Sequence, residues 1–264
     1  MMANELIYVY CMSESPPAID QLTEFDGLKS LVVEGFYLVI KFVPESEFSE
    51  INLKRNLSDL KWLEANAREH IIIISRVSES CTVIPFKFGT IYHSTDSIKD
   101  FVRNYSDSLN ENFHKIHGRE EWSVKIFYNR TVLSRQIDEL SEEAAALERQ
   151  IMASSPGKAF LLKRKKSDLI ETEMDRLCKK FGQEYFDEFK NNSVDSTIEN
   201  LIPKEYTGRD DTMILNANFL VEKEKVLRFT NVVENLRKKD GNTGFFIETT
   251  GPWPPFSFVF IKEK

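Results

Sequence analysis

The chain has 264 residues, which is enough for one large domain or two medium ones, and we expect two. Its 41% hydrophobic and 29% charged residues, with few glycines and prolines, exclude a disordered or fibrous chain. The net charge of −7 resides mainly in residues 1–118, which hold 11 Lys/Arg against 17 Asp/Glu. Neither half therefore has the cation excess that a phosphate-binding surface requires, and we expect no nucleic-acid partner.

The spacing of the cysteines and the length of the apolar runs bear on the cellular compartment. Cys11, Cys81 and Cys178 are far apart and form no C-x-x-C pair, as expected in a reducing environment. The first residues lack the basic region of a signal peptide, and no run approaches the roughly 18 apolar residues of a membrane span. We expect a cytoplasmic protein with no membrane partner.

The first half of the chain alternates strand and helix signals. Leu6–Cys11 is rich in β-branched and aromatic residues, which favours a strand, and Glu34-Gly35 separates two apolar runs as in an antiparallel hairpin. From Leu60 to Val77 apolar residues recur at three- and four-residue spacing, which predicts a helix with Ser58 as a possible cap. The isoleucines at 71–74 favour a strand instead, so local propensity and periodicity conflict there. The expected elements are strands at 6–11, 31–33, 36–43 and 82–92 and helices at 60–77 and 95–116, forming an N-terminal α+β domain over 1–118.

The second half predicts a long helical insertion between strands. Residues 122–128 alternate as in a strand with one buried face, and Leu133 to Ile151 follow the four-three spacing of a helix-pairing seam. Ser154–Gly157 forms a turn before a second long helix, so the two helices pair as a hairpin. Strands at 213–221, 244–250 and 256–261 and a helix at 223–238 complete the pattern. We therefore predict an α+β fold whose C-terminal domain, 119–264, is ferredoxin-like and carries a helical arm at about 130–192.

No catalytic, cofactor-binding or metal site is predicted. Pro156-Gly157-Lys158 lacks the remaining residues of a P-loop, because Met152 and Ala159 stand where glycine and Ser/Thr are required. His114 and His117 could share a metal with nearby glutamates, but a solvated histidine pair at a helix end is the more ordinary interpretation. No serine or cysteine stands in a recognisable nucleophile elbow.

The basic run Lys163–Lys166 has two interpretations. Clustered cations can bind phosphates or anionic lipid. Acidic residues follow at Asp168, Glu171, Glu173 and Asp175, however, so a salt-bridged helix face is the favoured prediction.

Two proline-containing apolar stretches remain. In Val83–Thr90 a proline enters an apolar strand, which predicts a sheet edge or bulge, and Pro85, Phe88 and Gly89 are its candidate contact or motif residues. In the stretch 251–260 prolines stiffen the approach to an aromatic final strand. Its candidate contact residues are Trp253, Pro254, Pro255 and Phe256. Core packing is favoured for Phe258 and Phe260, whereas Trp253 fits core and contact surface equally.

These stretches, in this order, resemble the gas vesicle protein F/L family (GvpF/GvpL). The likeness extends over nearly the whole chain: LIYVYC at 6–11, the segment from Trp62 to His70, VIPFKFGTIY at 83–92, EWSVK at 121–125, SSPGKAFLLKRK at 154–165 and GPWPPFSFV at 251–259. Cys11, Lys87 and Phe256 depart from the family pattern, where glycine, arginine and tyrosine are expected. The choice between the F and L subtypes stays open.

The resemblance implies a non-enzymatic accessory or minor component of gas vesicles that helps to nucleate or assemble the shell. Its partners would be the major shell protein and other accessory proteins, and its place the cytoplasm, in association with the vesicle. A soluble factor that masks an apolar shell subunit would limit premature aggregation.

Two alternatives predict different chemistry. A small-molecule or nucleotide-binding enzyme on the ferredoxin-like domain requires a polar pocket with converging titratable groups. An RNA-recognition role would use the aromatic sheet, but the acidic charge and the missing RNP-type strand disfavour it.

Overall fold

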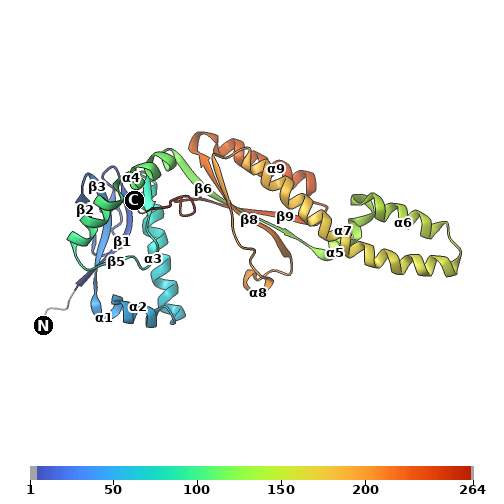
Figure 1. The fold of residues 1–264 in the computed structure, drawn as a ribbon, viewed down its shortest axis with the longest axis horizontal. Coiled ribbons are helices and arrows are strands. Elements are labelled where there is room, and N and C mark those ends of the chain that lie inside the picture. The colour runs from blue at the N-terminus through green and yellow to red at the C-terminus, as the bar shows by residue number, and fades with distance from the viewer. Residues whose placement is uncertain (1–4, 263–264) are drawn as a thin grey trace. The chain divides into compact units, whose positions relative to one another are not determined.

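The computed structural model describes residues 5–262, which divide into two compact units (Figure 1). The first unit runs to Glu121 and resumes at Pro252, and the second extends from Trp122 to Gly251. Strands β6 (Arg119–Tyr128) and β9 (Phe245–Trp253) cross the two points of division. In the part of the chain that is described, no helix is long and apolar enough to cross a membrane.

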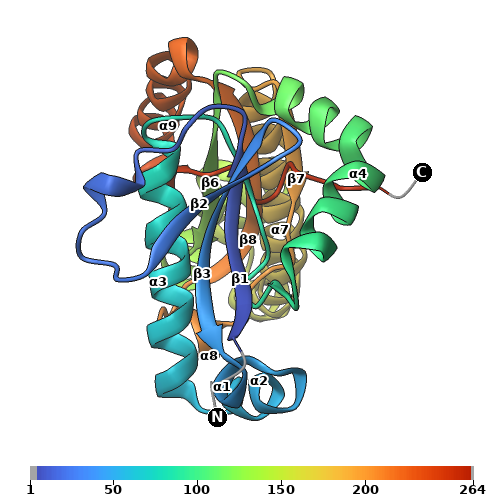
Figure 2. The same cartoon turned by 90° about the vertical axis from the view of Figure 1, so that its left-hand side faces the viewer.

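The first unit is one sheet with helices against both of its faces. The strand order is β2-β3-β1-β4, and β5 also pairs with β1. Figure 2 shows α3 and α4 on opposite sides of this sheet. The elements are β1 (Glu5–Ser13), η1 (Ile19–Gln21), β2 (Leu28–Val33), β3 (Phe36–Pro44), α1 (Glu45–Phe48), α2 (Glu50–Asn56), α3 (Leu60–Ser78), β4 (Val83–Pro85), β5 (Ile91–Tyr92) and α4 (Thr95–Ile116).

Strand β1 is buried from Leu6 to Ser13 because both faces of the sheet are covered. Tyr8 and Tyr10 belong to the apolar cluster beneath α3, whereas Ile7 and Val9 belong to the cluster beneath α4. A β-bulge between Val9 and Cys11 shifts the register, so Cys11 follows Tyr10 on the α3 side. The strand therefore contributes to two cores at once.

The predicted hairpin is confirmed, and its turn explains the residues at its tip. Strands β2 and β3 pair antiparallel, from Val33 opposite Phe36 to Leu28 opposite Lys41. Glu34 and Gly35 both have positive φ, 51° and 88°, as the central residues of a type I′ turn require.

The conflict over the isoleucine run resolves in favour of a helix. Ile73, Ile74 and Val77 of α3 are buried against the sheet, so tertiary packing outweighs the β propensity of these residues. Asp59, not Ser58, caps the helix, because its side chain accepts hydrogen bonds from the backbone N–H groups of Lys61 and Trp62. The predicted strand at 82–92 is divided into β4 and β5 by a turn at 87–90.

The second unit is a sheet of order β7-β8-β6-β9 with a group of helices. Its core joins inward residues of β6, β8 and β9 to α5, α7 and α9, with Phe219 and Phe229 fully buried at its centre. The elements after β6 are α5 (Arg130–Leu140), α6 (Glu142–Met152), α7 (Pro156–Lys190), β7 (Asp195–Ile198), α8 (Lys204–Thr207), β8 (Thr212–Glu222), η2 (Lys223–Lys225), α9 (Val226–Asp240) and β9.

The helix predicted at 133–151 is interrupted at Ser141. This residue has extended backbone angles, and its hydroxyl accepts a hydrogen bond from the backbone N–H of Ala144 at the start of α6. The same hydroxyl donates to the buried carboxylate of Glu173 on α7. The seam residues Leu133, Ile137, Ala144, Leu147 and Ile151 are buried as their spacing predicts, so the helix break preserves the apolar face.

The chain after β9 differs from the prediction in two respects. Residues 256–261 form a turn and an irregular segment, not a strand, because their backbone groups bond to side chains and to nearby prolines. Residues from Pro252 onward also group with the first unit, whereas the predicted domain of 119–264 places them in the second. We call the described residues 252–262 the C-terminal segment.

Candidate functional site

The first candidate stretch, Val83–Thr90, ends inside an aromatic cluster beneath α3. Pro85 lies in the short strand β4 opposite Cys11, at the edge of the sheet, where a proline removes no ladder hydrogen bond from a central strand. The ring of Phe88 contacts those of Tyr8, Trp62 and His70, at centroid distances of 6.3, 6.3 and 5.6 Å. Phe88 therefore contributes to packing within the unit.

Gly89 completes a turn that is tied to β1. Its φ of +80° favours glycine, and the backbone N–H of Thr90 donates to the carbonyl of Lys87 at 3.1 Å. The backbone N–H of Gly89 donates to the hydroxyl of Tyr8 at 3.1 Å. The glycine thus serves both the turn geometry and a partly buried hydrogen bond.

Buried His70 continues this hydrogen-bonded chain. Its Nε2 lies 3.0 Å from the carbonyl oxygen of Phe86, which can only accept, so Nε2 carries the proton. Nδ1 is then the acceptor for the Tyr8 hydroxyl at 2.9 Å. Burial lowers the pKa of His70 to about 4, outweighing the opposite effect of the Phe86 carbonyl. The imidazole is therefore neutral near pH 7 and its tautomer is fixed.

The second stretch separates into buried and exposed parts. Pro254, Pro255 and Phe258 are buried, whereas Trp253 and Phe256 are 38% and 37% exposed. The backbone N–H of Phe256 donates to the carbonyl of Pro254 at 2.7 Å, which holds a tight turn between the two exposed rings. Phe258 is core as predicted, but Phe260 is 60% exposed, so the core prediction for Phe260 is wrong.

Polar side chains far away in sequence anchor the C-terminal segment. The buried Glu121 carboxylate accepts hydrogen bonds from the backbone N–H and the hydroxyl of Ser257, each at 2.8 Å. On α4, Asn112 accepts from the backbone N–H of Phe260 and donates to its carbonyl, each at 3.0 Å. This pair of bonds replaces the ladder of a neighbouring strand. Sequence reasoning missed both anchors; the only signal was a polar Asn112 on the apolar face of its helix.

The two candidate stretches share one apolar cluster and diverge at Phe88. Ile84 and Phe86 of the first stretch belong to the cluster beneath α4, against which Val259 and Ile261 of the C-terminal segment also pack. Phe88 packs instead with the cluster beneath α3. These clusters lie on opposite faces of the sheet (Figure 2).

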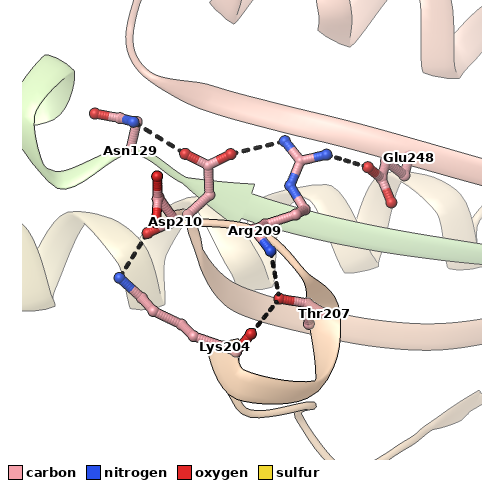
Figure 3. Close-up of polar contacts among 7 residues, drawn as sticks. Asn129, Lys204, Thr207, Arg209, Asp210 and Glu248 are labelled. Atoms are coloured by element: carbon pink, nitrogen blue, oxygen red, sulfur yellow. Dashed lines mark hydrogen bonds and ion pairs between the residues drawn. The ribbon is translucent and has the colours of Figure 1, made fainter.

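The second unit contains a polar network that no sequence pattern indicated (Figure 3). The guanidinium of Arg209 pairs with Glu248 on β9 and, at 2.7 Å, with Asp211, which also accepts from Asn129 at 3.0 Å. The same guanidinium lies 4.7 Å from the ring centroid of Phe127. Burial alone would raise the pKa of Asp211, but the hydrogen bonds from Arg209 and Asn129 lower it. The network fastens the segment before β8 to the sheet.

The predicted salt-bridged face of α7 is present in part. Glu171 and Glu173 form ion pairs, but with Arg130 and Arg176 and not with the basic run. Lys166 pairs with Asp138 and Glu148 of the neighbouring helices, at 2.6 and 2.9 Å. Lys163, Arg164 and Lys165 are exposed and form no ion pair with any described residue. Phe160 and Leu161, just before them, are 72% and 68% exposed.

The described residues include no group of three or more His, Cys, Asp or Glu side chains placed to hold a metal ion. The features that distinguish the molecule are therefore an interior aromatic cluster, an anchored C-terminal segment with exposed aromatic rings, and a basic, partly apolar helical hairpin. Together with the two sheets these features define a mixed helix-and-sheet protein.

The comparisons identify the family. The model of the family described as gas vesicle synthesis protein GvpL/GvpF matches residues 6–260, and the chain belongs to this family. Its role is accordingly related to gas vesicles. The family description names no enzymatic reaction.

Relatives of both subtypes are similar in sequence. Gas vesicle protein L of Streptomyces sp. (strain CB03234) is 26% identical over 222 residues, covering 84% of this chain and 79% of the relative. Gas vesicle protein F of Nostoc sp. (strain PCC 7120) is 27% identical over 256 residues, covering 88% and 89%.

Solved structures share the fold. The crystal structure of GvpF from Anabaena sp. PCC7120 aligns with a TM-score of 0.68 at 20% identity and covers 98% of both chains. The crystal structure of GvpF from Microcystis aeruginosa aligns with a TM-score of 0.65 at 19% identity, covering 98% of this chain and 100% of that one.

Proposed function

We propose that this protein binds the major gas vesicle shell protein and helps to nucleate or assemble the vesicle wall in the cytoplasm, together with other accessory proteins. Membership of the gas vesicle synthesis protein GvpL/GvpF family supports a role in forming gas vesicles. One structural observation carries the contact: Trp253 and Phe256 remain more than one-third exposed on a segment in which Pro254 and Pro255 are buried. Glu121 and Asn112 anchor the backbone of this segment.

Rigidity makes this segment suitable for binding. Aromatic side chains supply large contact area at low entropic cost, and prolines limit the conformations that the free chain can adopt. Trp253 and Phe256 are therefore presented in a fixed arrangement before a partner arrives. In this proposal Pro85, Phe88 and Gly89 contribute to the packing and turn geometry of the first unit and do not contact the partner.

The test is capture of the purified shell protein by the full chain. We expect Trp253→Ala to lose most of the captured shell protein while keeping the unfolding midpoint of the wild type. Tyr206→Ala is the matched control, because Tyr206 is an 82% exposed aromatic residue in the second unit. Equal capture by wild type and a folded Trp253→Ala variant would remove the proposed contact.

We also propose that the second unit is ferredoxin-like. Its elements follow the order β6, helices, β7, β8, α9, β9, which is the split β-α-β-β-α-β pattern, with α5 to α7 in the first helical position. The strand order β7-β8-β6-β9 supports this assignment, since the two central strands are the first and third of the pattern.

One groove of the second unit bears on the enzyme alternative. A groove of about 550 Å³ near the C-terminal end of α7 has the size of a ligand site. Its lining offers carboxamides, carboxylates, an arginine and aliphatic groups, but no histidine, cysteine or serine: Glu188, Asn192, Glu224, Leu227, Arg228, Asn231, Val232 and Asn235. Calorimetric binding of a nucleotide, lost in Arg228→Ala, would revive this alternative.

A further inference from the structure

A small cavity opens beside the aromatic cluster of the first unit. Its volume is about 210 Å³. Small-molecule sites usually measure roughly 300–1,000 Å³, whereas one water takes about 30 Å³, so the cavity suits a single side chain better than a metabolite. Its lining includes the rings of Tyr8, Tyr10 and Phe48 and the charged side chains of Lys41, Glu47 and Glu69.

The lining combines aromatic rings with an excess of negative charge. The lining holds two carboxylates, Glu47 and Glu69, and one ammonium, Lys41, which gives a formal charge of −1. Lys41 pairs with Glu69 Oε1 at 3.0 Å, and Tyr10 donates to the same oxygen at 3.1 Å. Trp62 donates its indole N–H to Glu47 Oε1 at 2.6 Å. Among the described residues, every side-chain hydrogen bond to Glu47 and Glu69 is therefore accepted by the Oε1 atom of the carboxylate.

A cation would interact favourably with both the aromatic rings and the excess negative charge of this lining. Aromatic rings attract cations through their quadrupoles, and a partly desolvated carboxylate binds an ammonium or guanidinium more strongly than one in water. An anion would meet two carboxylates, and an uncharged alkyl chain would leave the extra charge uncompensated. We propose that this cavity binds the ammonium or guanidinium end of one lysine or arginine side chain from a protein partner.

This inference deepens the proposed function and rests on it only for the identity of the partner. Two sources of the cation share this chemistry. One is a second copy of the chain, whose Lys163, Arg164 and Lys165 are exposed and without ion pairs among the described residues. The other is a basic residue of a different gas vesicle protein.

The probe is n-butylammonium, with n-butanol and butyrate as uncharged and anionic controls. The reporter is the indole N–H resonance of Trp62, which donates to Glu47 and is assigned by its disappearance in Trp62→Phe. We expect a saturable shift with n-butylammonium at millimolar concentration and none with n-butanol or butyrate. Equal shifts with n-butanol, or no shift with n-butylammonium, would overturn the proposal.

Matched variants locate the binding. Glu47→Gln and Glu69→Gln keep an oxygen for Trp62, Tyr10 and Lys41, so the local packing is retained. Each should weaken n-butylammonium binding about tenfold through the loss of a charge-assisted contact. Glu64→Gln, on the same helix as Glu69 but exposed and outside the cavity, should leave it unchanged. Unchanged affinity in both cavity variants would also overturn the proposal.

Sedimentation of the full chain distinguishes the two sources. Association that is lost in Glu47→Gln and in Lys163→Gln/Arg164→Gln/Lys165→Gln assigns the cation to a second copy. A monomer that still binds n-butylammonium assigns it to another protein. Neither experiment contains the shell protein, so failure of the cavity proposal is distinguishable from failure of shell binding through Trp253.

Discussion

The turn at Lys87–Thr90 and the C-terminal segment belong to the same unit, and each combines aromatic residues with a backbone held by distant polar groups. The N–H of Gly89 in the turn donates to the hydroxyl of Tyr8, and the carbonyl of Phe86, just before the turn, accepts from His70. In the C-terminal segment the buried carboxylate of Glu121 holds the backbone at Ser257, and the rings of Trp253 and Phe256 remain partly exposed. The two regions are similar in composition, but the aromatic residue of the turn packs within the unit whereas two aromatic residues of the C-terminal segment stay partly exposed.

The largest expected effect tests the division of the C-terminal segment into buried and exposed rings. Phe258→Ala should destabilise the protein by about 3–5 kcal/mol, because the ring is 1% exposed and its removal leaves a cavity. Phe260→Ala should cost at most about 1 kcal/mol, since that ring is 60% exposed and loses mainly its contact with Lys115. Urea unfolding of both variants measures the difference. Equal costs would contradict the assignment of one ring to the core.

The interior of the turn region predicts a dependence of stability on pH. The pKa of His70 falls from 6.5 to about 4 on folding, so between these values the unfolded chain takes up a proton that the folded chain does not. The stabilisation is complete above pH 6.5 and is lost as the pH falls, by about 3 kcal/mol at pH 4. Urea midpoints at pH 7, 5.5 and 4 should show a shallower slope for His70→Gln than for wild type. The exposed His93→Gln control should keep the wild-type slope. Identical slopes in wild type and His70→Gln would exclude His70 as the titrating group.

The smallest effect concerns the anchor on α4. Asn112→Ala removes the two hydrogen bonds to Phe260, and we expect a loss of about 1 kcal/mol, because the freed backbone groups gain access to water. Amide exchange of Phe260 should accelerate in this variant and remain unchanged in Asn110→Ala, whose side chain is exposed on the same helix. Unaltered exchange in Asn112→Ala would show that other contacts hold the segment.

Periodicity predicted the elements that bury one continuous face. The helices at 60–77 and 95–116 correspond to α3 and α4, and the hairpin of β2 and β3 follows from the apolar runs around Glu34-Gly35. The isoleucine run illustrates why spacing outweighed propensity: Ile73 and Ile74 gain burial against the sheet that a solvated strand would not provide.

Features that depend on contacts between distant residues left little signal in the sequence. Ser141 interrupts a regular apolar seam because its hydroxyl serves both α6 and Glu173, which is 32 residues away. The C-terminal segment has the composition of a strand, yet Asn112 and Glu121 supply the bonds that a neighbouring strand would have supplied. Of the candidate site residues, spacing alone could not tell that Phe88 turns inward while Trp253 stays partly exposed.

The central claim is that the shell protein contacts the C-terminal segment, and site-specific photocrosslinking tests it most directly. A benzophenone amino acid replaces Phe256 in one variant and Tyr206, an 82% exposed aromatic residue of the second unit, in the other. With purified shell protein, the account predicts a crosslinked product from position 256 and little from position 206. Equal yields at the two positions, or none from position 256 in a folded variant, would contradict it.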